Sequence, residues 1–246
     1  AYLEGKSGLL NAPTGSGKTY ALWIPCLLEY LQEEQLERSS LRVLWVTPLR
    51  ALAKDIQRAM QEAALELKIN WEVGMRTGDT TATERQNQKK HAPEALVITP
   101  ESLHILLSQS DYPHYFRNLQ SIIVDEWHEI LGTKRGVATE LAISRLKSIT
   151  RKPLKVWGIS ATIGNLKQAK RVLLGEDLYK HAVEIRSDVE KKVMVESILP
   201  DEVDSLPWSG HLGTHLLHKI IPIIQQSKTT LLFTNTRSQT ELWYQA

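Results

Sequence analysis

Short apolar runs rich in Val, Ile and Leu recur along the chain, separated by longer stretches in which apolar residues repeat every three or four positions. Apolar runs without alternation indicate strands buried on both faces, and the longer spacing is typical of amphipathic helices. Strands that alternate with helices predict βαβ units, and therefore an α/β fold with a mostly parallel sheet between helix layers. The predicted strands are 9–12, 41–46, 95–98, 121–124, 155–159 and 229–233, and the predicted helices are 18–35, 49–68, 138–149, 211–226 and 238–246.

The pattern changes after Gly175, which indicates a change of domain. Residues 183–185 and 193–199 alternate apolar and polar positions, as half-exposed strands do. Pro222 should end or kink the helix that contains it. One strand and part of a helix cannot form a core by themselves, so we expect a second α/β domain that only begins here. The predicted division is a first domain at 1–175, a linker with short strands at 176–210 and the start of the second domain at 211–246.

Composition narrows the class of protein. Of the 246 residues, 42% are hydrophobic and 24% are charged, which is typical of a folded globular protein. The chain lacks an uninterrupted apolar run of about 18 residues, which argues against a membrane-spanning helix and a membrane partner. The formal net charge of +2 argues against a broad basic surface, so any nucleic-acid binding must come from a local surface. The single cysteine, Cys26, suits a reducing compartment, and we expect a cytoplasmic protein.

The sharpest chemical motif is Ala-Pro-Thr-Gly-Ser-Gly-Lys-Thr at 12–19, between a short predicted strand and a predicted helix. Its glycines let successive backbone N–H groups point into one concavity, and the helix N-terminus adds a positive dipole end. This pattern is a P-loop and predicts binding of ATP with Mg²⁺. The Gly-Lys-Ser letters at 5–7 lack such a loop and predict a solvated turn. The residues predicted to hold the nucleotide are Thr14, Gly15, Ser16, Gly17, Lys18 and Thr19.

A pair of acids follows the predicted strand 121–124. We expect Asp125 to hold Mg²⁺ together with Thr19, and Glu126 to orient and polarise the attacking water. Adjacent carboxylates at a buried strand end would be costly without a cation, and the alternative is an exposed acidic turn. A Ser-Ala-Thr sequence ends another predicted strand, where small hydroxyls can bond to the acidic motif. The predicted catalytic residues are Lys18, Asp125, Glu126 and His128, and the predicted coupling residues are His128, Ser160 and Thr162.

These motifs, taken in order, resemble those of superfamily 2 helicases of the DExH type. Ala-x-Thr-Gly-Ser-Gly-Lys-Thr, Asp-Glu-x-His and Ser-Ala-Thr carry the likeness, which covers nearly the whole chain. The chain also resembles the large helicase-related (Lhr-like) proteins, particularly the bacterial ligase-associated DEXH-box helicases. That narrower likeness rests on Val-Thr-Pro-Leu-Arg-Ala-Leu-Ala at 46–53, Arg-Thr-Gly-Asp-Thr at 76–80, Val-Asp-Glu-Trp-His-Glu at 124–129 and Gly-Ile-Ser-Ala-Thr-Ile-Gly at 158–164.

The resemblance implies a RecA-like three-layer domain, the start of a second RecA-like domain, and ATP bound between the two. It implies an ATP-dependent nucleic-acid translocase or helicase that acts on DNA, moves 3′ to 5′ and serves DNA repair. A DNA ligase and a nuclease are implied as partners by family association. The family's second domain supplies transition-state arginines, which would lie beyond Ala246, and its adenine-sensing motif would lie before Ala1. We therefore expect this chain alone to bind ATP and Mg²⁺ weakly and to hydrolyse little.

Several other stretches predict contacts to a nucleic-acid backbone. Thr-Pro at 47–48 and again at 99–100 offers a helix N-terminus and a hydroxyl, which suit a phosphate, although Pro is also an ordinary helix start. Gly-Asp at 78–79 is alternatively a plain turn, and the Thr and Asn before the last helix are alternatively its caps. Backbone contacts predict little sequence specificity and strong salt dependence. The candidate nucleic-acid residues are Thr47, Pro48, Arg50, Thr77, Gly78, Thr99, Pro100, Glu101, Thr234, Asn235, Thr236 and Arg237.

Two other functions stay open on the sequence. An RNA helicase or ribonucleoprotein remodeller uses similar backbone-reading motifs, and only contacts to the 2′-OH separate RNA from DNA. A nucleotide-dependent scaffold or switch would bind partners in response to ATP without translocating. Small-molecule P-loop kinases are disfavoured, because the acid pair with its histidine and the two Thr-Pro strand ends have no role in them.

Overall fold

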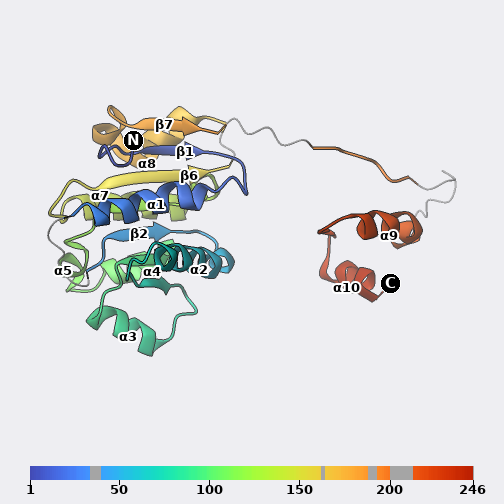
Figure 1. The fold of residues 1–246 in the computed structure, drawn as a ribbon, viewed down its shortest axis with the longest axis horizontal. Helices are drawn as coiled ribbons and strands as arrows, with labels where there is room; N and C mark the ends of the chain where they lie inside the picture. Colours follow the sequence, from blue (N-terminus) through green and yellow to red (C-terminus); the bar gives the residue numbers. More distant parts are fainter. Residues whose placement is uncertain (34–39, 162–163, 188–192, 200–212, 246) are drawn as a thin grey trace. The chain divides into compact units, whose positions relative to one another are not determined.

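The computed structural model describes residues 1–33, 40–161, 164–187, 193–199 and 213–245 (Figure 1). The chain divides into two compact units, Ala1–Val189 and Glu190–Ala246, and each is described by itself. Among the described residues, we find no helix with the length and apolar character that a membrane span needs.

The first unit is built on one seven-stranded sheet. Its strands are β1 (Gly8–Asn11), β2 (Val43–Val46), β3 (Val73–Arg76), β4 (Ala95–Ile98), β5 (Ser121–Val124), β6 (Lys155–Ser160) and β7 (Val183–Arg186). They lie in the order β3-β4-β2-β5-β6-β1-β7, and every pairing is parallel. The predicted α/β fold with a parallel central sheet is therefore confirmed.

Helices cover both faces of this sheet, so the unit has three layers (Figure 1). One face carries α1 (Lys18–Leu31) and α2 (Arg50–Glu66). The helix α3 (Ala82–Lys90) has no buried residue and lies beyond the edge strand β3. The opposite face carries α4 (Pro100–Leu107), α5 (Tyr112–Phe116), α6 (Trp127–Ile130), α7 (Lys134–Lys147) and α8 (Leu166–Tyr179).

Two hydrophobic cores, one on each side of the sheet, explain the uninterrupted apolar strands. Successive strand side chains point to opposite faces. In β2, Val43 and Trp45 pack with the α1 and α2 side, and Leu44 and Val46 pack with the other side. Both sets are buried, so no strand position facing either helix layer tolerates a polar group without cost.

Three local differences from the predicted elements have physical causes. The sequence does not predict β3, because Val-Gly-Met-Arg has neither an apolar run nor a clear alternation. The strand β7 falls in the predicted linker, yet it pairs with β1, so the first compact unit continues past residue 175. Residues 193–199 and 229–233 form no strand, since a strand needs a neighbour to bond with and no described residue pairs with them.

The second unit contains a 3₁₀ helix (Gly213–Leu216), α9 (Leu217–Gln226) and α10 (Arg237–Gln245). The sequence predicts that Pro222 ends or kinks its helix, but α9 continues through it, so this proline does not end the helix. Leu231 and Phe233 are 78% and 88% exposed. Large apolar side chains that are this exposed are typical of a surface that packs against other protein. That these residues begin a second RecA-like domain stays a prediction.

Glutamine side chains cover the free edge of the sheet. The Gln61 amide donates to Trp71 O and its carbonyl oxygen accepts from Val73 N, both at 2.9 Å. Gln57 donates to Val73 O at 2.8 Å, and Gln88 donates to Met75 O at 2.9 Å. An exposed strand edge is a template for pairing with another chain. Amide side chains from α2 and α3 therefore replace the missing neighbour strand of β3.

We predict that Gln61→Ala lowers the free energy of unfolding by about 1–2 kcal/mol, because two backbone groups of the edge lose a partner. Urea unfolding followed by tryptophan fluorescence measures this change. Gln86→Ala is the control, since Gln86 is exposed on α3. Equal midpoints for the two variants would show that the edge does not depend on its glutamine cover.

Candidate ATP site and nucleic-acid edge

The P-loop leaves the carboxyl end of β1 and enters α1. Gly15 and Gly17 have φ angles of 78° and 81°, a backbone region that strains residues with a side chain. Gly17 is the N-cap of α1 and provides no side-chain bond to the first turn, whose N–H groups keep their donor capacity. Thr14, Gly15 and Ser16 are exposed, and Ser16 N donates to Pro13 O at 3.3 Å. The loop thus presents backbone donors and a helix N-terminus, which fit a phosphate group.

Lys18 is the residue of this loop whose surroundings best fit an anion. Its side chain is 9% exposed, and its Nζ is buried with no hydrogen-bond partner. The nearest carboxylate oxygen, Oε1 of Glu126, lies 3.9 Å away, which is an ion pair without a hydrogen bond. A buried ammonium that lacks hydrogen bonds is costly, so these residues fit a group that brings phosphate oxygens.

The predicted acids lie where β5 ends. Glu126 adopts a left-handed backbone conformation with φ 44° and ψ 45°, and it is the N-cap of α6. Its N–H donates to Oδ1 of Asp125 at 2.9 Å. A non-glycine residue held in this region costs on the order of 1 kcal/mol or more and is found preferentially at functional sites. The strained turn is what directs Glu126 toward Lys18.

Asp125 is 7% exposed. Burial, and then the neighbouring negative charge of Glu126, raise the pKa of its carboxyl from 3.8 to about 6. A divalent cation would favour the ionised form, which fits the predicted Mg²⁺ role shared with Thr19 in the first turn of α1. Among the described residues, no three acids, histidines or cysteines gather into a metal cluster. Nucleotide-bound Mg²⁺ uses one or two protein oxygens plus phosphates, so such a cluster is not needed.

His128 and Ser160 meet across neighbouring strand ends. The Ser160 Oγ lies 3.0 Å from His128 Nδ1, and the same nitrogen lies 3.4 Å from Oε2 of Glu126. The other ring nitrogen lies 3.2 Å from Oε1 of Glu129. The structure therefore brings two of the three predicted coupling residues to the acid pair, and Thr162 lies outside the described residues.

Asn11 belongs to this site although the sequence reading does not single it out. Its Nδ2 lies 3.4 Å from both Ser160 O and Ala161 O, which joins the start of the P-loop to the end of β6. Ala12 N also donates to Ser160 O at 3.0 Å. A polar residue at the end of an otherwise apolar strand, directly before the P-loop, is the signal that could have identified it.

The predicted nucleic-acid residues of the first unit gather at the ends of β3, β4 and β2, beside the acid site. The three threonines at these ends, Thr47, Thr77 and Thr99, are at most 2% exposed. The Thr99 hydroxyl donates to Ser102 Oγ at 3.1 Å, and Thr77 Oγ1 accepts from Asp79 N at 3.2 Å. These threonines are buried within the loops, and a contact of the Thr47 and Thr99 hydroxyls with a phosphate stays a prediction.

Exposed groups at this edge include Arg50, Gly78, Asp79 and Glu101, whereas Pro48 and Pro100 are buried. Arg50 is 58% exposed, and its Nη1 lies 3.7 Å from Oδ1 of Asp79. A Cβ on Gly78 would lie 3.0 Å from the Arg50 Cζ. Gly78 therefore allows the guanidinium to lie flat against the loop, where it remains accessible to an anionic strand.

Arg135, which the sequence reading does not single out, joins two of these loops. Its Nε and Nη2 donate to the two carboxylate oxygens of Glu101 at 2.6 and 3.3 Å, and Nη2 also donates to Pro48 O at 2.8 Å. Burial raises the pKa of Glu101, but the hydrogen bonds and charge of Arg135 outweigh that effect and lower it. Glu101 is therefore an ionised partner of Arg135.

The predicted contacts of the second unit cap its last helix. Thr236 Oγ1 accepts from Gln239 N at 3.2 Å, and Asn235 N donates to Oε1 of Gln239 at 3.1 Å. The Thr234 hydroxyl donates to Thr236 O at 3.1 Å, and Arg237 is exposed at the helix start. This geometry favours the capping alternative for Thr236.

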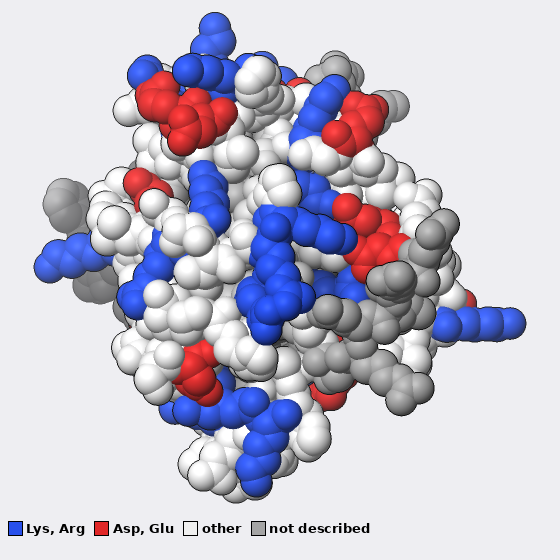
Figure 2. All heavy atoms as spheres, turned by 90° about the vertical axis from the view of Figure 1, so that its left-hand side faces the viewer, with Lys and Arg blue, Asp and Glu red and all other residues white. Residues whose placement is uncertain are grey.

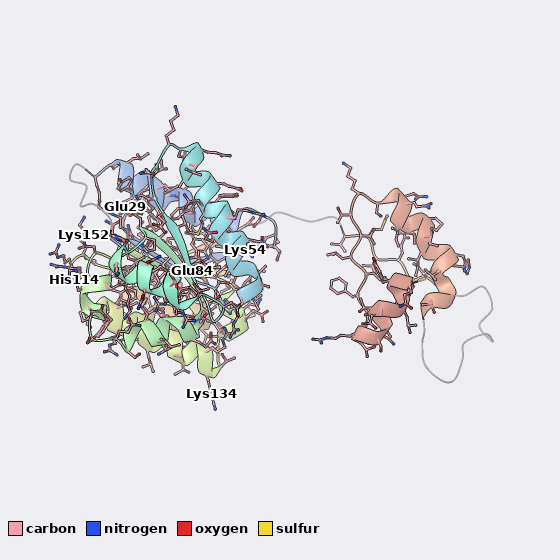
Figure 3. The ribbon with its side chains drawn as sticks, turned by 90° about the horizontal axis from the view of Figure 1, so that it is seen from below. Glu29, Lys54, Glu84, His114, Lys134 and Lys152 are labelled. Atoms are coloured by element: carbon pink, nitrogen blue, oxygen red, sulfur yellow. The ribbon has the colours of Figure 1, made fainter. Side chains whose placement is uncertain are left out.

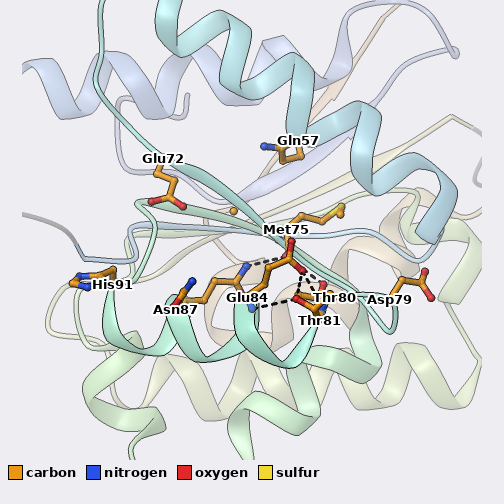
Figure 4. Close-up of a pocket in the computed structure, with 11 residues that line it drawn as sticks. Gln57, Glu72, Met75, Asp79, Thr80, Thr81, Glu84, Asn87 and His91 are labelled. Atoms are coloured by element: carbon orange, nitrogen blue, oxygen red, sulfur yellow. Dashed lines mark hydrogen bonds between the residues drawn. The ribbon is translucent and has the colours of Figure 1, made fainter.

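A groove near this edge is lined by residues outside the P-loop and the acid pair (Figure 4). It runs beside β3, between α2 and α3, and no P-loop or acid-pair residue lines it. Thr81 and Glu84 close a capping box at the start of α3 on its rim, and Asp79 is shared with the Gly78 loop.

Charge is mixed on the opposite side of the unit. Glu29, Lys152 and His114 lie toward one end of the sheet, and Lys54 and Lys134 lie toward the other (Figure 3). The face drawn in Figure 2 is the Lys152 end, and its basic side chains lie among acidic and uncharged ones. This pattern agrees with a local and not a broad basic surface.

Comparison with known proteins decides the family. Residues 1–170 match the model described as DEAD/DEAH box helicase. This chain belongs to that family. The helicase chain is also 36% identical over 255 residues to ATP-dependent helicase Lhr-Core of Methanocaldococcus jannaschii, and 28% identical over 263 residues to Lhr helicase/uracil glycosylase of Escherichia coli. These matches cover 97% and 95% of this chain but only 29% and 17% of the two relatives.

A solved structure agrees with these relatives. Mycobacterium smegmatis helicase Lhr bound to ssDNA and AMP-PNP has a TM-score of 0.78 and 26% identity, and the match covers 98% of this chain and 32% of that chain. The resemblance to Lhr-like helicases and the RecA-like fold are therefore confirmed. The narrower likeness to ligase-associated helicases stays a prediction.

We predict that Asp125→Asn stabilises the chain at pH 7.5 in the absence of Mg²⁺ and nucleotide, by about 1–3 kcal/mol. The folded pKa of Asp125 is raised, so the folded state holds the extra proton between about pH 4 and 6, and wild-type stability falls as pH rises through that window. Asparagine keeps the oxygen that accepts from Glu126 N and carries no charge.

Urea unfolding at a series of pH values measures the effect. Asp55→Asn is the matched control, since Asp55 is 67% exposed on α2. Parallel pH profiles for wild type and Asp125→Asn would contradict the assigned burial penalty.

Proposed function

We propose that the intact protein is an ATP-dependent DNA translocase or helicase of the Lhr type. The observation that carries this proposal is the buried, hydrogen-bond-free Nζ of Lys18 facing Glu126 at the end of a P-loop. The neighbouring strand ends supply a second set of exposed groups suited to a nucleic-acid backbone. A fold that places both sets on one edge supports coupling of ATP hydrolysis to movement along a strand.

Each residue of the ATP site has a role that its position supports. Lys18 and the P-loop amides bind the β- and γ-phosphates, and Thr19 and Asp125 hold Mg²⁺. Mg²⁺ supplies charge neutralisation of the phosphates when bound. Glu126 orients the attacking water and accepts its proton, and Lys18 stabilises the charge that develops. His128 lies beside the Glu126 carboxylate and, through Ser160, connects it to the end of β6.

DNA is the favoured nucleic acid because the Lhr helicase that resembles this chain is described as bound to ssDNA. Contacts through Arg50, the Gly78 loop and the N-termini of α2 and α4 would follow the backbone without reading bases. Movement 3′ to 5′, a role in DNA repair, and ligase or nuclease partners are supported by family likeness. We also propose that this 246-residue chain hydrolyses little ATP alone, because it spans under a third of these relatives.

We predict that Lys18→Ala weakens nucleotide binding by the intact protein at least tenfold, since it removes the cation that binds phosphate. Glu126→Gln should keep nucleotide affinity within about threefold and lower kcat by about 10²–10⁴, as removal of a general base does. Fluorescent-nucleotide titration and phosphate release measure the two effects.

Lys6→Ala is the matched control, because Lys6 occupies the Gly-Lys-Ser sequence at 5–7 that forms no P-loop and is 46% exposed. Wild-type turnover in Glu126→Gln would show that another residue activates the water.

We predict that ssDNA stimulates ATP hydrolysis by the intact protein at least tenfold more than ssRNA of the same sequence, with a stimulation that weakens as salt rises. Steady-state phosphate release at several salt concentrations measures both. Equal stimulation by RNA would argue for an RNA helicase, and no stimulation by either would argue for a nucleotide-dependent switch. The same assay on the 246-residue chain should give little hydrolysis, and robust DNA-stimulated turnover there would contradict that part of the proposal.

A further inference from the structure

Arg135 follows the acid pair in the chain and binds two of the loops at the proposed nucleic-acid edge. Its guanidinium binds both oxygens of Glu101, at the start of α4, and Pro48 O, in the loop between β2 and α2. These contacts lie 34 and 87 residues away in the sequence. A planar guanidinium can make three such bonds at fixed angles, whereas a lysine ammonium acts as a point charge.

The ion pair contributes little to stability by itself. The side chains of Arg135 and Glu101 are 38% and 51% exposed, and exposed ion pairs contribute about 0–1 kcal/mol. Its effect is positional, since it fixes the distance between the loops that follow β2 and β4. These are the loops that the proposed function assigns to the nucleic acid.

The backbone that carries Arg135 is tied closely to the ATP site. Glu126 is the N-cap of α6, and α6 ends at Ile130. The Thr133 backbone N–H and hydroxyl both donate to Ile130 O, at 3.0 and 2.6 Å, and Thr133 Oγ1 accepts from Gly136 N at 3.3 Å. A Cβ on Gly136 would lie 2.2 Å from Ile130 O. The turn between α6 and α7 is therefore tight and is held by its own hydrogen bonds.

The helix on the ATP side of this turn is also held firmly. Trp127 is fully buried, and its Nε1 donates to Ala169 O at 3.0 Å. Ile130 is 1% exposed. A change in the backbone at Glu126 would therefore move α6 and the tight turn together, and Arg135 with them. Short rigid elements of this kind can carry coupling between two sites.

We propose that Arg135 is a positioning residue that transmits the state of the Glu126 turn to the nucleic-acid loops, through Pro48 O and the Glu101 carboxylate. The proposal rests on the proposed function, because it needs both ATP and nucleic-acid binding. It differs from the contact between His128 and Ser160, which lies on the side of the acid pair toward β6 and β1. By this route ATP binding changes the affinity for DNA, and DNA binding changes the affinity for ATP by the same factor.

The test measures that factor in the intact protein. The affinity for fluorescein-labelled oligo-dT is determined by anisotropy with and without AMP-PNP and Mg²⁺, and the ratio of the two Kd values is the coupling. Arg135→Lys should bring the ratio to within about twofold of one, with AMP-PNP affinity in the absence of DNA unchanged within about twofold. Glu101→Gln should also bring the ratio of the two Kd values closer to one. The double variant should bring it no closer to one than Arg135→Lys does.

Lys134→Ala is the matched control, because it removes a positive charge from the same turn and Lys134 projects away from the body of the unit (Figure 3). It should keep the wild-type ratio. Arg135→Lys with the wild-type ratio would overturn the proposal, and so would equal weakening of DNA binding with and without AMP-PNP. If Arg135→Lys does not fold, the proposal is tested with Glu101→Gln. A wild-type ratio in that variant, or equal weakening of its DNA binding with and without AMP-PNP, would overturn the proposal. A wild-type protein that binds neither DNA nor AMP-PNP would instead overturn the proposed function.

Discussion

Parallel pairing of short, doubly buried strands is the constraint on which the rest of the structure depends. Because both faces of the sheet are covered by helices, the middle positions of the inner strands are apolar, and buried polar side chains such as Ser121, Lys155 and Ser160 stand at the first or last position of a strand. Polar chemistry is therefore excluded from the strand interiors and appears at their ends. Since all seven strands run the same way, their carboxyl ends meet at one edge, and the loops that follow them bring polar groups from several strands together.

The order of the strands then divides that edge into two neighbouring halves. The ends of β3, β4 and β2 carry the loops proposed to contact nucleic acid, and the ends of β5, β6 and β1 carry the proposed ATP site. The boundary lies between β2 and β5. Arg135 enters from the segment that follows β5 and reaches the loops that follow β2 and β4, so it crosses that boundary. Because one side chain connects the two halves of this edge, the arrangement favours coupled binding of the proposed nucleotide and nucleic acid.

The ATP half is held in a state that costs stability. Lys18 is buried without a hydrogen bond, Asp125 has a pKa raised to about 6, and Glu126 has a strained backbone. Each of these features is unfavourable in the chain alone, and bound phosphate oxygens and a divalent cation would offset the burial of Lys18 and Asp125. The surrounding hydrophobic layers supply the stability that lets such a site persist.

The P-loop, the acid pair and most buried strands could be predicted from the sequence, because each depends on a few neighbouring residues: glycines that allow positive φ, or an apolar run. The roles of Asn11 and Arg135, the burial of the Thr47 hydroxyl and the glutamine cover of β3 could not. These features join residues far apart in the chain, 149 positions in the case of Asn11 and Ser160. The packing of the sheet and its helix layers decides which strand ends are neighbours. This order cannot be predicted from the residues of any one segment.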